Sequence, residues 1–211
     1  MRLLLYGATG MIGQRILAEA VERGHEVTAA ARNPDRVQAL PGVTPHQGDV
    51  LNGDSVAGLA EGHDAIVSAV GPGHAADPSF LVEAARVLIS AAEWTGARLV
   101  VLGGTVCTED EPGLLPAATT DFAATWMGLV PAHREALDLY RAAPSRVGWT
   151  YVSPAATVEL GQRTGHYRTG EDELVVDEDG RSRISAEDLA AAILDEVEQP
   201  RHRRQRVTVG Y

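Results

Sequence analysis

Short apolar runs alternate with amphipathic segments along most of the chain. The runs predict strands at 3–6, 26–31, 65–70, 98–102 and 149–153, and we expect a further strand at 43–47. Between them, apolar residues recur at helical spacing, which predicts helices at 11–23, 77–95 and 131–143 and shorter ones after Pro34 and near Asp54. We expect Asp54 and Asp77 to act as N-caps. Strands that alternate with helices are typical of an α/β protein in which helices flank both faces of a parallel sheet.

The last quarter of the chain breaks this alternation. It predicts a hairpin (173–176 and 181–184) around an acidic turn at 177–180, a helix from Ser185 to about Glu198 and a final strand at 206–209. No linker is evident, so we expect one domain, 1–211. Its expected additions are a lid over the substrate at about 104–130 and a small C-terminal cap at about 155–184.

Gly7, Gly10 and Gly13 follow the first strand and lead directly into the first helix. Only glycine lets the backbone turn tightly and approach a pyrophosphate, and the free amides of the helix then bind the anion. This context predicts a dinucleotide-binding turn, and the alternative is a tight turn without a ligand. The expected cofactor contacts from this turn are Gly7, Thr9, Gly10, Met11 and Ile12.

The second strand ends at Arg32, where an acidic residue would bind the ribose of NAD. A guanidinium is instead suited to the 2′-phosphate of NADP, so the sequence predicts NADP(H), with Arg36 as a second candidate ligand. The alternative for Arg32 is an ordinary surface arginine. In a doubly wound (Rossmann) sheet, ligands lie at the carboxyl ends of the strands. We therefore expect Asp49 and Val50 beside the adenine, and Ala69, Val70 and Gly71 beside the ribose and phosphates.

Composition excludes several classes of function. The 18 cationic and 29 acidic side chains give a net charge of −11, which disfavours nucleic acid or an anionic membrane as a partner. All the cations are arginines, so Schiff-base chemistry and a Walker-A lysine are excluded. Cys107 is the single cysteine, which fits a reducing cytoplasm, and no histidine spacing indicates a metal site.

Several motifs match one family over nearly the whole chain: Gly7-Ala8-Thr9-Gly10-Met11-Ile12-Gly13, Ala31-Arg32-Asn33-Pro34, Gly48-Asp49-Val50, Val70-Gly71-Pro72, Ser153-Pro154 and Ile184-Ser185 with Asp188-Leu189-Ala190. On these motifs the chain resembles the atypical short-chain dehydrogenases/reductases, in the NAD(P)-binding, NmrA-like branch that includes flavin/biliverdin-IXβ reductase. The resemblance implies a cofactor contact at Pro154, NADPH as hydride donor, and a flavin, quinone or other conjugated carbonyl compound as acceptor.

The chain departs from typical short-chain dehydrogenases, which use a Tyr-x-x-x-Lys pair. It has no lysine, and the helix in question reads His133-Arg134-Glu135-Ala136-Leu137. The usual tyrosinate mechanism is therefore not possible. The flavin-reductase-like branch that the chain resembles also lacks the pair, so catalysis is not excluded.

Two residues are the candidates for catalysis. Thr105 follows the fifth strand, where the family's active-site serine or threonine lies, and its hydroxyl could donate to a substrate carbonyl; the alternative is a turn-stabilising residue. His133 could supply a proton near neutral pH, and the alternative is a structural histidine. Weaker candidates are Tyr140, expected in the core, Tyr151 and Tyr167, which could reach the pocket, and Cys107, expected to be an inert thiol.

The sequence thus predicts a cytoplasmic, NADPH-dependent oxidoreductase that reduces a small conjugated carbonyl, quinone or flavin-like molecule by hydride transfer. We expect a monomer or homodimer. The main alternative is an NmrA-like NADP-binding redox sensor without turnover. An isomerase or epimerase that recycles its cofactor is a lesser one.

Overall fold

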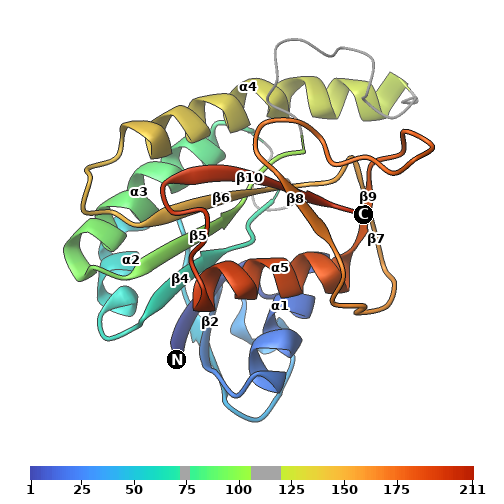
Figure 1. The fold of residues 1–211 in the computed structure, drawn as a ribbon. Coiled ribbons are helices and arrows are strands. Elements are labelled where there is room, and N and C mark those ends of the chain that lie inside the picture. The colour runs from blue at the N-terminus through green and yellow to red at the C-terminus, as the bar shows by residue number, and fades with distance from the viewer. Residues whose placement is uncertain (72–76, 106–119) are drawn as a thin grey trace.

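The computed structural model describes residues 1–71, 77–105 and 120–211, with side chains from 129 onward in the last range. Its main element is an eight-stranded sheet in the order β3-β2-β1-β4-β5-β6-β10-β8 (Figure 1). The strands are β1 (Arg2–Tyr6), β2 (Glu26–Ala31), β3 (Val43–Gln47), β4 (Ala65–Ser68), β5 (Arg98–Leu102), β6 (Trp149–Pro154), β8 (Arg168–Gly170) and β10 (Gln205–Gly210). All neighbours in this sheet are parallel except β10 and β8. The predicted α/β fold with a doubly wound parallel sheet is confirmed.

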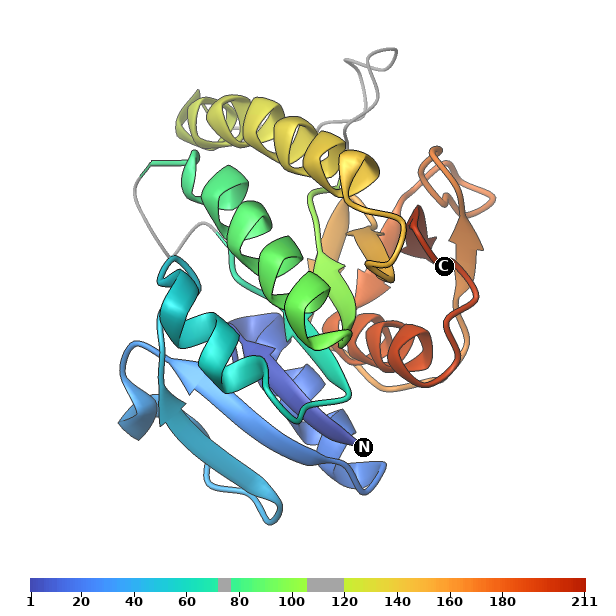
Figure 2. The same ribbon diagram turned by 90° about the vertical axis from the view of Figure 1, so that its left-hand side faces the viewer.

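Helices form a layer on each face of the sheet (Figure 2). Two of them, α1 (Met11–Glu22) and α5 (Ala186–Glu198), pack together on one face. On the other face α3 (Phe80–Thr95) packs against both α2 (Gly53–Ala60) and α4 (Thr120–Ala142). Strand β1 serves both layers, because side chains alternate between the faces of a strand: Leu3 and Leu5 join the core under α1 and α5, and Leu4 and Tyr6 join the other.

Two predicted helix caps are wrong by a few residues. Helix α2 is capped by Asn52, whose side chain accepts a hydrogen bond from the Ser55 amide at 3.1 Å, and Asp54 lies in its first turn. Helix α3 begins at Phe80, because Asp77 instead holds a turn by accepting a 2.9 Å hydrogen bond from the Ser79 amide. Strand β4 ends at Ser68 instead of residue 70.

Helix α4 begins at Thr120, not at Pro131 as predicted. Proline is common at a helix start because it lacks an N–H group, which is why position 131 suggested a boundary. In α4 it lies inside the helix, where the missing hydrogen bond is offset by apolar packing of buried Leu129, Ala132, Leu137 and neighbouring residues. Residues 120–130 of the expected lid are thus helical. Residues 106–119 lie outside the described residues, so the lid remains a prediction.

The C-terminal part differs from the predicted hairpin. The turn at 177–180 forms, with the Gly180 amide donating to the Asp177 carbonyl at 2.9 Å, but 173–176 is not a strand. Instead β9 (Arg183–Ser185) pairs in parallel with β7 (Thr157–Glu159), and β8 adds to the sheet edge at β10. Pairing with strands distant in the sequence decides this arrangement. The Ser185 N-cap of α5 is confirmed, since its hydroxyl accepts a hydrogen bond from the Asp188 amide at 3.0 Å.

Candidate functional site

One cavity of about 1110 Å³ opens where the carboxyl ends of the parallel strands meet. It is the place where ligands bind in doubly wound folds. The described residues that line it are Tyr6, Gly7, Thr9, Gly10, Met11, Ile12, Ala30, Ala31, Arg32, Asn33, Arg36, Gly48, Val50, Ala69, Val70, Gly71, Leu102, Gly103, Gly104, Thr105, Leu129, His133, Pro154, Ala156, Thr157 and Val158. The structure therefore brings together both predicted catalytic residues and every predicted cofactor residue except Asp49.

The glycine turn has no room for side chains. Gly7 has φ +86°, and a Cβ there would overlap the Ala69 carbonyl; a Cβ on Gly13 would overlap the carbonyl of Gly7. Gly10 is the N-cap of α1 and supplies no side-chain hydrogen bond to the helix. The first amides of α1 are thus left to an external acceptor, next to the positive end of the helix dipole. This cradle fits the pyrophosphate of a dinucleotide.

Positive charge lies beside β2. Arg32 and Arg36, both exposed, are the only arginines among the described lining residues, and the side chain of Asn33 between them accepts a hydrogen bond from the Asp35 amide at 3.2 Å. A carboxylate for the ribose hydroxyls of NAD is not found among the described residues of this lining. The guanidinium groups suit a phosphate at this position.

Asp49, predicted beside the adenine, is not among the described residues that line the cavity. Its carboxylate accepts a hydrogen bond from the Leu51 amide at 3.0 Å, and its carbonyl accepts one from Asn52, also at 3.0 Å. Asp49 thus stabilises the turn after β3, and the neighbouring Gly48 and Val50 form the wall.

The opposite end of the cavity is formed by the ends of β5 and β6. Thr105 Oγ1 donates to the Ala155 carbonyl at 3.3 Å, a contact that stabilises the two strand ends and uses its hydrogen within the protein. His133 comes from α4, and its Nδ1 lies 2.9 Å from the hydroxyl oxygen of Tyr151 on β6. Gly104 makes this possible, because a Cβ there would be 2.7 Å from Cδ2 of the His133 ring.

The surroundings of His133 favour a hydrogen-bond donor over the predicted proton donor. Burial lowers its pKa to about 4, so the imidazole is neutral at pH 7. The sequence predicts that His133 titrates near neutral pH. Its burial depends on the packing of α4 against strands that are distant in the sequence, which local patterns do not reveal. A neutral imidazole can still donate a hydrogen bond to a bound oxygen.

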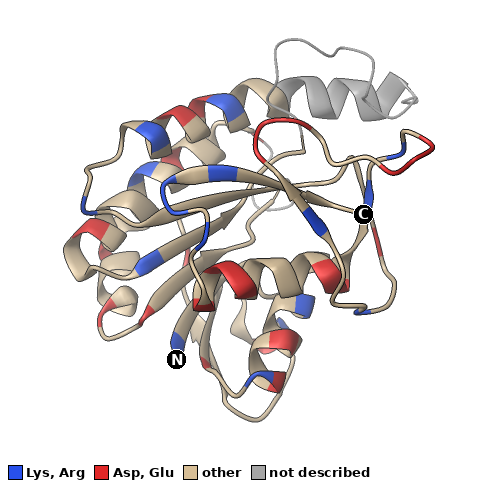
Figure 3. Ribbon diagram, in the orientation of Figure 1, with Lys and Arg blue, Asp and Glu red and all other residues tan. Residues whose placement is uncertain are grey.

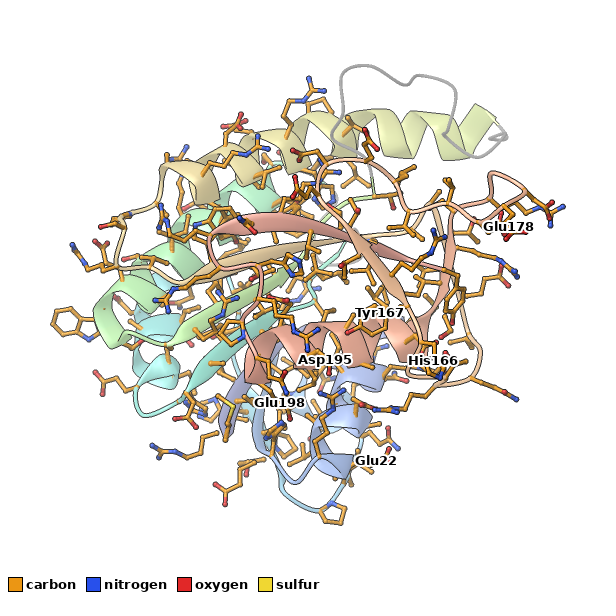
Figure 4. All side chains as sticks on the ribbon, viewed as in Figure 1. Glu22, His166, Tyr167, Glu178, Asp195 and Glu198 are labelled. Carbon is orange, nitrogen blue, oxygen red and sulfur yellow. The ribbon has the colours of Figure 1, made fainter. Side chains whose placement is uncertain are left out.

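The remaining candidates lie elsewhere. Tyr140 is buried in the core, as expected, and burial raises its pKa. Tyr151 lies beneath His133 and not in the described cavity wall. Tyr167 instead donates to Asp195 of α5 (Figure 4), and Cys107 lies outside the described residues.

Sequence reasoning missed Tyr6, which immediately precedes the glycine turn and lines the cavity. Its buried hydroxyl has no hydrogen-bond partner among the described residues, and burial raises its pKa. Its position at the carboxyl end of β1 was the available signal.

The fold and the glycine cradle define a dinucleotide-binding α/β protein. The chain belongs to the NAD(P)H-binding family, whose model matches residues 7–200, and is thus a member of an oxidoreductase family. YwnB of Bacillus subtilis, an uncharacterised protein, is 36% identical over 99% of this chain and 98% of its own length.

Solved structures are also similar to this protein over its full length. A Burkholderia pseudomallei protein named as a candidate exported protein is 41% identical, with a TM-score of 0.84 and 100% of both chains covered. A Streptococcus pneumoniae protein named as a candidate NADH-flavin reductase is 30% identical, with a TM-score of 0.81, covering 100% of this chain and 99% of the other. Within the described residues, no helix is long and apolar enough to cross a membrane.

Proposed function

We propose that this protein is an NADPH-dependent reductase that transfers hydride to a conjugated carbonyl, quinone or flavin-like small molecule. The observation that carries the proposal is the continuity of the cavity, which joins the glycine cradle and the two arginines to the His133 end. Its volume of about 1110 Å³ exceeds the usual range of small-molecule sites, which supports room for an acceptor beside the cofactor.

The preference for NADPH rests on charge at the β2 end. Arg32 and Arg36 would bind the 2′-phosphate, and the α1 amides behind Gly7 and Gly10 would bind the pyrophosphate. The name of the Streptococcus relative includes NADH, so the choice between the two cofactors needs a direct measurement in this chain.

The acceptor end favours a largely apolar molecule with a carbonyl oxygen. Leu102, Leu129 and Val158 contribute apolar wall, while His133 is the polar side chain placed to meet an oxygen. NADPH, when bound, supplies the hydride. His133 would orient the acceptor and stabilise negative charge on its oxygen, with Thr105 as a second polar contact after its bond to Ala155 rearranges.

The direct test is oxidation of NADPH by the purified protein, followed at 340 nm, with quinones, flavins and enones as acceptors. We expect turnover of at least one acceptor above the rate without enzyme. Absence of turnover across the panel contradicts the proposal, and tight binding of both NADP⁺ and NADPH in that case would favour the redox-sensor alternative.

Location and assembly belong to the same proposal. A cytoplasmic enzyme, as monomer or homodimer with a small-molecule substrate, fits a chain with one cysteine. The Burkholderia relative's name points instead to export. Fractionation of cells that express the tagged full chain distinguishes the two locations.

A further inference from the structure

The hydroxyl of Tyr151 is buried beneath the His133 ring, and among the described residues three polar groups lie within hydrogen-bond distance of it. His133 Nδ1 lies 2.9 Å from the phenol oxygen, the Gly104 amide nitrogen 3.4 Å and the His133 carbonyl oxygen 3.5 Å. Tyr151 itself is only 1% exposed. These contacts restrict how the phenol can share its hydrogen.

The Gly104 amide can only donate, so the phenol oxygen accepts its hydrogen. The single hydroxyl hydrogen then goes to another acceptor. Nδ1 is the closer one, and the His133 carbonyl lies inside α4, where it accepts a helical hydrogen bond. A phenol is also a stronger acid than a neutral imidazole, which is in turn the stronger base, so O–H···N is the favoured direction.

The two glycines after β5 leave room for both rings to pack closely. A Cβ on Gly103 would overlap the Tyr151 ring, and one on Gly104 would meet Cγ of His133 at 2.8 Å. The Tyr140 ring packs against Tyr151 from α4, with centroids 5.8 Å apart. Core packing thus holds the Tyr151 ring, so that its hydroxyl stays beneath the His133 ring.

We infer that Tyr151 is a positioning residue, which accepts the Gly104 amide and donates to His133 Nδ1, and so fixes His133 as the tautomer with hydrogen on Nε2. His133 lines the cavity, and within the described part of the chain no protein group hydrogen-bonds Nε2. This nitrogen is the donor toward an acceptor oxygen. The catalytic role of this donor rests on the proposed function. The assignment of the His133 tautomer does not depend on it.

The reduction then has a defined proton balance. Bound NADPH would supply the hydride, breaking one of its C–H bonds and leaving NADP⁺. The new C–H bond at the electron-poor acceptor carbon would displace the π electron pair onto the carbonyl oxygen. The Nε2–H group stabilises that charge by a hydrogen bond and keeps its hydrogen, because burial holds His133 neutral with a pKa of about 4. The proton that completes the product comes from water.

The tautomer can be measured without any acceptor. In the full chain labelled with ¹⁵N-histidine, at pH 7 with NADP⁺ present, two-dimensional NMR separates protonated from unprotonated ring nitrogens, and the His133→Gln variant assigns the signal. We expect Nε2 protonated and Nδ1 unprotonated. A protonated Nδ1, or a ring that titrates near pH 6.5, overturns the inference.

Kinetics then separate positioning from a merely structural role. Tyr151→Phe should lower kcat about ten-fold, leave KM for NADPH unchanged and give a mixture of His133 tautomers. Tyr140→Phe is the matched control, since Tyr140 is a similarly buried tyrosine whose ring packs at a tilt against Tyr151, and it should change neither kcat nor the tautomer.

Two substitutions at position 133 distinguish a neutral donor from a proton donor. His133→Gln retains an N–H group and should keep kcat at least ten-fold above that of His133→Leu, which loses about 100-fold against wild type. The wild-type kcat should be flat from pH 5.5 to 8. Equal loss in both variants, with a kinetic pKa near 6.5, overturns the inference. No turnover by wild type contradicts the proposed function alone, and the NMR result still decides the tautomer.

Discussion

The guanidinium of Arg163 lies against the carboxylate of Glu19, with Nη2 2.8 Å from Oε1 and Nε 2.9 Å from Oε2. Arg163 belongs to the C-terminal cap, whereas Glu19 is a buried residue of α1. Arg23 holds the same carboxylate from the next turn of the helix, with Nε 2.8 Å from Oε1. This cluster attaches the cap to α1, the helix that follows the glycine turn.

Replacing Glu19 by glutamine should destabilise the protein. The substitution leaves two guanidinium groups beside a neutral amide, and loss of one partner of a buried ion pair costs about 3–5 kcal/mol, which we reduce to about 1–3 because Arg163 is half exposed. Urea denaturation measures the loss. The control Arg181→Gln breaks the exposed Arg181–Asp179 pair in the cap and should change stability by less than about 0.5 kcal/mol. Equal effects of the two substitutions would contradict this account.

The same contacts make the cap sensitive to acid. Burial alone would raise the pKa of Glu19, but hydrogen bonds from Arg163 and Arg23 bring it below its ordinary value of 4.5. A carboxylate with a lowered folded-state pKa contributes stability that is present above pH 4.5 and is lost as the pH falls through the folded-state pKa. We expect the free energy of unfolding to fall below pH 4.5, and less steeply in Glu19→Gln. An identical slope in both proteins would rule out this role of Glu19.

Adding one methyl group to the cradle should abolish cofactor binding. In Gly13→Ala the new Cβ overlaps the Gly7 carbonyl and forces the turn open, so we expect the Kd for NADPH to rise at least about 100-fold. Gly58→Ala is the control, because a Cβ in the middle of α2 meets no atom within 4 Å and stabilises the helix by up to about 1 kcal/mol. Unchanged binding by Gly13→Ala would show that the turn does not hold the cofactor.

Uncharged acceptors should react faster than anionic ones. The cavity's described arginines, Arg32 and Arg36, both lie at the cofactor end, and segments 72–76 and 106–128 contain no arginine in their sequence. The cap adds acidic residues at 171–173 and 177–179 (Figure 3). We predict about ten-fold higher kcat/KM for riboflavin than for FMN, and for 1,4-naphthoquinone than for its 2-sulfonate, with a smaller ratio at high salt. Equal rates at low salt would exclude this charge selection.

Local patterns predicted the sheet well. Strands β2 and β3 begin and end at the predicted residues, because glycine and proline turns bound these short segments. The start of α4 and the pairing of β7 with β9 were not predictable in this way. Both depend on contacts with elements far away in the sequence, which override the proline at 131 and the acidic turn at 177–180.

In the candidate site, too, local patterns predicted some features, and others depend on contacts between distant elements. The residues next to the glycine turn and Arg32 lie in the cavity because strand ends converge at one edge of a parallel sheet, and the sequence gives the strand ends directly. The state of His133 depends on Tyr151 and on burial, which only the packing of α4 over β6 reveals. Asp49 is of a residue type that suits both a ligand and a turn, and in the structure its carboxylate accepts a hydrogen bond in a turn.

Isothermal titration calorimetry with NADPH and NADH tests the central claim most directly. We predict that wild type binds NADPH more tightly than NADH, and that Arg32→Ala weakens NADPH binding about 10- to 100-fold, as expected for the loss of a charge-assisted contact, while NADH binding stays the same. Failure to bind either nucleotide would contradict a cofactor site in this cavity. Equal affinity for both, unaffected by Arg32→Ala, would contradict recognition of the 2′-phosphate.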